Sequence, residues 1–185
     1  MSLPDLGKRL SFALPVYVGL TYLVVCGQLI LDLEPAIEGP FLWYAFLLVS
    51  TCAALFVLPL VLLALLATWI ADRSEDSRWM TAQSLLVFLA WLLASGLQIG
   101  LDADRILFSI FAFHLNGFVW NLVTTAGGLE SLGGSTSSDW PFALRALGWG
   151  GLQLVLLALA DAIAKHRREA TLREIGRASC RERVW

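Results

Sequence analysis

The chain has 185 residues, of which 58% are hydrophobic and only 15% are charged. Together with a mean hydropathy of +0.72, this composition excludes an ordinary soluble fold. The formal net charge of −2 argues against nucleic acid as a partner, because phosphate binding requires clustered positive charge.

Four apolar runs make up most of the chain. Each run reaches the ~20 residues that an α-helix needs to cross a hydrocarbon core about 30 Å thick. The runs cover residues 10–31, 41–71, 80–101 and 141–164. We therefore predict an all-α fold, a polytopic membrane bundle of four transmembrane helices within residues 1–173. Because the connections between the runs are short, no room remains for a soluble catalytic domain.

Basic residues are distributed unevenly around the four runs. Lys and Arg near the ends of spans are retained in the cytoplasm. Only Arg105 and Arg145 fall beside the segments 32–40 and 102–140. The other side carries Lys8, Arg9, Arg73, Arg78, Lys165, Arg167 and Arg168. This bias predicts that both ends of the fragment lie in the cytoplasm and that 32–40 and 102–140 lie outside it.

The segment that follows the third run, about 104–123, is still apolar but carries polar side chains at helical spacing. Its aromatic residues point in other directions and are Phe108, Phe111, Phe113, Phe118 and Trp120. The pattern predicts an amphipathic helix that lies in the outer interface with its rings in the acyl boundary. A fifth span over 106–123 is the alternative. It would move the last basic cluster outside, which the distribution of basic residues opposes.

Polar and small residues between 102 and 131 are candidates for contacts with lipid head groups or with another domain, because aromatic rings favour that depth. They are Asp102, Asp104, Arg105, His114, Asn116, Asn121, Gly127, Gly128, Glu130 and Ser131. A catalytic histidine needs a nucleophile or an orienting acid, and the sequence alone places none beside His114. We therefore favour a histidine satisfied by local hydrogen bonds.

Small residues predict two surfaces for close helix packing. Glycines at such positions let a second helix approach closely. These glycines are Gly96 and Gly100 in the third run and Gly148 and Gly151 in the fourth. Near the end of the fourth run, Asp161 lies one turn before Lys165. An i,i+4 ion pair is therefore expected there rather than a proton relay.

The sequence contains no P-loop, no HExxH and no GxSxG. We therefore predict no catalytic, cofactor-binding or metal-binding residue, no cofactor, and no enzymatic activity for this fragment alone. The spans also lack ionisable side chains near mid-membrane, which argues against a pump or an ion-coupled transporter.

Residues 101–133 resemble the membrane region of bacterial sulfatase-like proteins of the alkaline phosphatase superfamily. The stretch reads LDADRILFSIFAFHLNGFVWNLVTTAGGLESLG. It has an acidic residue at a span exit, an aromatic stretch that ends in FHLN, and a Gly-Gly-x-Glu-Ser turn. The matching positions are Asp102, Phe113, His114, Leu115, Asn116, Gly127, Gly128, Glu130 and Ser131. Among such proteins, the stretch resembles the inner-membrane members that regulate lipopolysaccharide or are similar to phosphoethanolamine transferases.

The resemblance implies a membrane anchor in the bacterial inner membrane. Such proteins have five membrane helices and then a large periplasmic domain, which holds the divalent metal and the nucleophile. This chain lacks that domain, so the resemblance implies contacts with membrane lipids, with the missing periplasmic domain and with other envelope proteins. A complete small scaffold or sensor is the first alternative, and a transporter or channel is the second.

The end of the chain, 174–185, has a different character. The stretch EIGRASCRERV, which starts at Glu174, looks like a translated sequencing adapter. We therefore expect an artefactual tail without a biological role, and a natural protein that continues beyond about Arg173.

Overall fold

The structure is a computed structural model, which describes residues 3–31, 41–73, 77–111, 114, 125 and 139–182. Almost all of these residues lie in four α-helices. They are α1 (Leu3–Leu31), α2 (Phe41–Arg73), α3 (Ser77–Phe111) and α6 (Asp139–Glu182). The predicted all-α fold is therefore confirmed.

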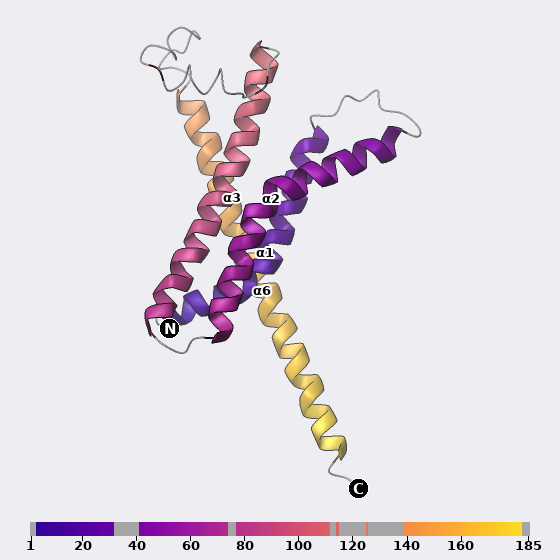
Figure 1. The fold of residues 1–185 in the computed structure, drawn as a ribbon, viewed down its shortest axis with the longest axis vertical. Helices are drawn as coiled ribbons and strands as arrows, with labels where there is room; N and C mark the ends of the chain where they lie inside the picture. The colour runs from indigo at the N-terminus through magenta and orange to yellow at the C-terminus, as the bar shows by residue number, and fades with distance from the viewer. Residues whose placement is uncertain are drawn as a thin grey trace.

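Each helix is long and apolar enough to cross a membrane. The qualifying stretches are Arg9–Leu31, Phe41–Ala71, Thr81–Ser109 and Trp140–Arg167. In Figure 1 successive helices run in opposite directions, so the start of α1 and the end of α6 lie toward the same end of the bundle. We call this the lower end, and the end where α3 finishes and α6 starts the upper end. The prediction of a multi-pass membrane protein is confirmed.

α1 is the hub of the bundle, because it packs against α2, α3 and α6. α3 also contacts the other three helices, whereas α2 and α6 do not touch each other in the described ranges. The bundle is therefore a central α1–α3 pair with one helix on each flank (Figure 1). Side chains on the inner faces are mostly small, such as Ala13, Ala53, Ala90 and Ala160, and allow close approach of the helices.

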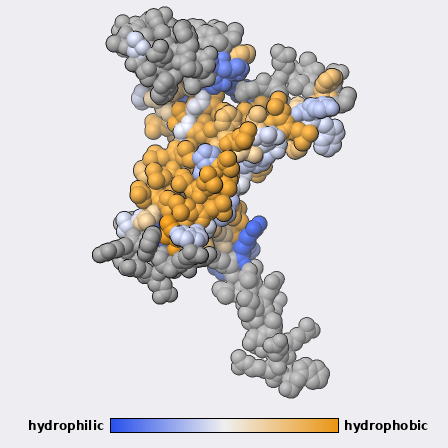
Figure 2. Space-filling model, viewed as in Figure 1, coloured by the Kyte–Doolittle hydropathy of each residue, from blue (hydrophilic) through white to orange (hydrophobic). Residues whose placement is uncertain are grey.

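The outer faces of the helices carry large apolar side chains. Trp43, Leu62, Phe88 and Leu154 are exposed, as are many other leucines and aromatic residues. Figure 2 shows hydrophobic side chains over the middle of the molecule. In a soluble protein such a surface would cause aggregation, but in a bilayer it faces lipid tails.

α2 is bent along its length and leans away from α3 at its upper end (Figure 1). Pro59 lies inside this helix, and a proline removes one backbone hydrogen bond and favours a bend. The side chains of the first two turns of α2 are nearly all exposed. This part of α2 therefore packs little against the other described helices.

The third helix is longer than the sequence suggested. We expected a span that ends at 101 and a separate interfacial helix from about 104, but α3 continues without a break to Phe111. Asp102, Asp104 and Arg105 therefore lie within a continuous helix. They do not end it, because charged residues near the end of a span can stay helical while their side chains reach water or partners. Most of 112–123 lies outside the described residues, so the choice between an interfacial and a spanning segment stays open.

Candidate functional site

Several of the predicted contact residues lie close together at the upper end of the bundle. Asp102 on α3 forms an ion pair with Arg145 on α6, with 3.5 Å between Oδ1 and Nη1. Arg105, one turn later on α3, donates through Nη2 to the backbone carbonyl of Leu31 at 3.2 Å. That carbonyl belongs to the last residue of α1, where no further helical turn supplies a partner. The two arginines therefore connect α3 to both α6 and α1.

The same end of α3 holds an Asp–His pair. His114 Nδ1 lies 2.9 Å from Oδ2 of Asp104, and the imidazole stacks on Phe108 with 4.5 Å between ring centroids. The side chain of His114 is 69% exposed, whereas that of Asp104 is 29% exposed. The acid that sequence analysis could not place beside His114 is therefore Asp104. The pair holds the imidazole at the surface of the upper end.

The other predicted contact residues cannot be placed. Asn116, Asn121, Gly127, Gly128, Glu130 and Ser131 lie outside the described residues. The site as described therefore consists of Asp102, Asp104, Arg105, His114 and Arg145, which we call the upper cluster.

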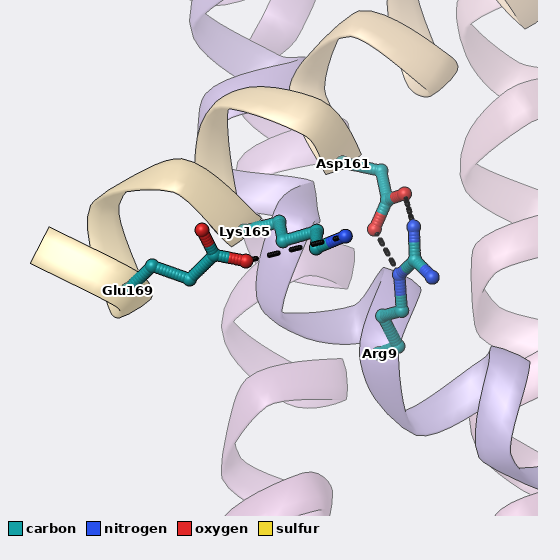
Figure 3. Close-up of polar contacts among 4 residues, drawn as sticks. All are labelled: Arg9, Asp161, Lys165 and Glu169. Carbon is teal, nitrogen blue, oxygen red and sulfur yellow. Dashed lines mark hydrogen bonds and ion pairs between the residues drawn. The ribbon is translucent and has the colours of Figure 1, made fainter. Parts of the chain in front are cut away.

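The lower end carries an ion pair that joins the first and last helices (Figure 3). Arg9 Nε donates to Oδ1 of Asp161 at 2.7 Å, and Arg9 Nη2 donates to Oδ2 of the same carboxylate. This two-bond arrangement suits the planar guanidinium. Lys165, on the next turn of α6, instead lies 4.0 Å from Glu169.

The predicted pair between Asp161 and Lys165 is therefore wrong. The inner face of α6 places Asp161 against α1, where the fork of Arg9 binds both carboxylate oxygens. Lys165 is exposed and finds its acid one turn further along the helix. The sequence carried part of the signal for the Arg9–Asp161 pair, because an even number of spans places the start of the first and the end of the last on the same side of the membrane.

Polar side chains continue through the interior between these two ends. Thr21 on α1 donates to Oε1 of Gln153 on α6 at 3.3 Å, and both side chains are completely buried. Trp91 on α3 donates through Nε1 to the carbonyl of Gly150 on α6 at 3.2 Å. Gln83 and Gln98 on α3 are also completely buried. Sequence analysis missed this polar interior, because isolated glutamines in apolar runs do not reveal which way they face.

The predicted packing glycines do not lie at helix contacts within this chain. Side-chain positions at Gly96, Gly100, Gly148 and Gly151 would meet no atom within 4 Å, and all four residues are exposed. The inner face of α3 is built instead from Ala90 and Ala94, which lie on a different side of the helix. The described helices of this chain therefore do not pack on these glycines, and close packing against another helix at these positions stays a prediction.

The chemistry available at these sites is hydrogen bonding and ion pairing. Over the described ranges, no three His, Cys, Asp or Glu side chains are grouped as metal ligands. An Asp–His pair such as Asp104–His114 can take a proton from a hydroxyl group that lies beside it. The nearest hydroxyl along α3, that of Ser109, instead donates to the carbonyl of Ile106 in its own helix. The upper cluster is suited to binding polar or charged groups at the end of the bundle.

Comparison with known proteins gives no relative: the chain matches no family model, no curated protein and no solved structure.

Proposed function

We propose that this chain is the membrane-anchoring domain of a sulfatase-like protein of the bacterial inner membrane, and that its upper cluster contacts lipid head groups or a periplasmic domain. The observation that carries the proposal is the upper cluster itself. Charged side chains at the end of four apolar helices are fixed by contacts across α1, α3 and α6. Two members of the cluster, Asp102 and His114, are also among the positions at which residues 101–133 match sulfatase-like membrane regions.

The depth of the upper cluster supports a contact with head groups. Trp43 and Tyr44 near the start of α2 and Trp140 near the start of α6 are largely exposed. Trp and Tyr favour the boundary between head groups and acyl chains. The start of α6 is also where Arg145 binds Asp102. Charged groups at this level reach phosphates and amines of lipids without entering the hydrocarbon.

The lipid contact is tested by retention of lipids on the purified protein. The protein is reconstituted in bilayers of phosphatidylethanolamine and phosphatidylglycerol and then extracted with detergent. The lipids that stay bound are counted by native mass spectrometry. The His114→Ala and Arg145→Ala variants should retain fewer lipids than the parent protein. Ser109→Ala is the matched control, because this hydroxyl binds only its own helix. Equal retention by all variants would remove head groups as the ligand of the upper cluster.

The proposed orientation places the lower end, with both ends of the chain, in the cytoplasm. It rests on the seven basic residues that flank the spans on this side. Alkaline phosphatase fused after residue 170 should be inactive, and the same reporter inserted within 133–138 should be active. An active fusion after residue 170 would instead support a fifth span over 106–123.

The parent protein is tested by extending the gene beyond codon 173. A fifth span followed by a metal-binding hydrolase domain is the result that the proposal expects, and a stop codon there would favour a small scaffold or sensor. Purified residues 1–173 should have no metal-dependent phosphatase or sulfatase activity. Measurable activity would contradict the assignment of this part of the chain to anchoring.

A further inference from the structure

A polar face runs along α3 inside the bundle. Gln83, Ala90, Ala94 and Gln98 follow helical spacing on one side, and each is almost completely buried. Gln83 and Gln98 are 15 positions apart, which corresponds to about 22 Å along the helix, or most of a hydrocarbon core. This face therefore carries amide groups at two widely separated depths.

The amide groups on this face have no hydrogen-bond partner among the residues that the structure describes. Neither the oxygen nor the nitrogen of Gln83 and Gln98 makes a hydrogen bond, although both side chains have zero exposure. On α6, Gln153 uses its oxygen for Thr21 but leaves its nitrogen without a partner. Ser95 on α3 is a further buried hydroxyl without a partner. Unpaired polar groups are costly in a membrane, where lipid offers no hydrogen bonds.

The buried part of α2 differs, because its inward residues are apolar from Val49 to Ala71. Within the described ranges, the side chains with an unpartnered buried amide atom are Gln28 on α1, Gln83 and Gln98 on α3 and Gln153 on α6, and none is on α2. These amides therefore lie on the three helices that the ion pairs at the two ends of the bundle connect. An ion pair stands at each end of this region. Asp161 closes the lower end and Asp102 the upper end, and their side chains are only 14% and 15% exposed.

We infer that water enters the bundle and binds along a hydrated seam between α1, α3 and α6, lined by Thr21, Gln83, Gln98 and Gln153. Water matches this lining, because one molecule donates two hydrogen bonds and accepts two, as an amide pair requires. A charged ligand does not match, because the groups between the two ion pairs are neutral amides and hydroxyls. This inference does not depend on the proposed anchoring function.

Gln98→Met tests the seam through thermal unfolding of the full chain in lipid nanodiscs. Methionine has a similar volume and no hydrogen-bonding group of comparable strength. In a hydrated seam it removes partners of bound water, and the melting temperature should fall by roughly 2–4 °C. In a dry interior it removes an unpaired amide, and the melting temperature should rise or stay unchanged, which would overturn the inference. Leu97→Met, the adjacent residue, controls for the side chain itself.

A second measurement detects water directly. Gln153→Cys, Leu154→Cys and Val57→Cys are made in a chain whose own cysteines at 26, 52 and 180 are replaced by alanine. Leu154 faces lipid at the same depth, and Val57 is buried on α2. A thiol reacts as the thiolate, which requires water, so Gln153→Cys should react with methyl methanethiosulfonate about tenfold faster than both controls. A rate equal to that of Val57→Cys would overturn the inference.

Discussion

α2 and the α1–α3–α6 region are held in the bundle in different ways. The buried residues of α2 are apolar, and the hydroxyl pair Tyr22–Ser50, at 2.6 Å, links it to α1. The α1–α3–α6 region uses ion pairs, a tryptophan-to-backbone bond and buried amides. Lipid tails are as apolar as leucine, so burial of apolar groups alone barely favours helix association in a bilayer. Polar contacts therefore define the α1–α3–α6 arrangement, whereas α2 depends on the fit of its side chains.

This difference also explains the shape of the bundle. α2 leans away at its upper end, where its first two turns have little contact with other helices (Figure 1). α6 is instead tied to α1 and α3 near both ends of its membrane-spanning part, through Asp161 and Arg145. Helices joined by directional contacts at two depths have little freedom to separate.

The largest effect is expected from a substitution that creates a cavity on the buried side of α2. Leu60 is 2% exposed, and Leu60→Ala should lower the free energy of unfolding by about 2 kcal/mol, because a leucine-sized cavity loses its packing contacts. Thermal unfolding in nanodiscs measures the loss. Leu62 on the same helix is 59% exposed to lipid, and Leu62→Ala should change the stability by less than about 0.5 kcal/mol. Equal losses would show that α2 is not held by packing.

Removal of the hydroxyl link of α2 should have a smaller effect. Tyr22→Phe deletes the hydroxyl pair with Ser50 and should cost about 0.6 kcal/mol, the usual size of such a contact between membrane helices. Tyr44→Phe is the control, because Tyr44 is 72% exposed. A loss larger than that of Leu60→Ala would mean that α2, too, depends on a polar contact.

Alanine at the exposed glycines should raise stability slightly. Gly96→Ala and Gly148→Ala add a methyl group that meets no atom of this chain, and alanine is the better helix former by roughly 0.5–1 kcal/mol. Unfolding of the monomeric protein measures the gain. If both variants are instead less stable and the parent protein runs as a dimer, a second chain packs on these glycines.

The smallest effect on stability is expected at the lower end. Asp161→Asn removes the charge that Arg9 binds, but the Arg9 side chain is 42% exposed, so water compensates for part of the loss. We expect a small decrease in melting temperature that shrinks in high salt. Exchange of the two residues, Arg9→Asp with Asp161→Arg, should restore the parent value, and Lys165→Ala should have no effect.

The sequence predicted the helices well and their contacts poorly. The run 41–71 differs from α2 by two residues, because apolar composition alone determines where a chain can cross a bilayer. The inward faces were harder to predict, since both sides of a membrane helix are apolar and periodicity carries little information. Gly96 and Gly100 show this limit, because their spacing predicted a contact but they face outward. The contact between Asp104 and His114 could not be predicted, because it depends on the continuation of α3 past residue 101.

The hub position of α1 has a consequence for biosynthesis. α1 precedes the other three described helices in the chain, and each of them packs against it. α2 and α3 can therefore dock on α1 as they are inserted. α6 follows the other three described helices, so Arg9 on α1 is made before its partner Asp161. Errors in the insertion of α1 would remove a contact that each of the other three described helices makes, whereas errors in the insertion of α6 would leave α1, α2 and α3 in contact with one another.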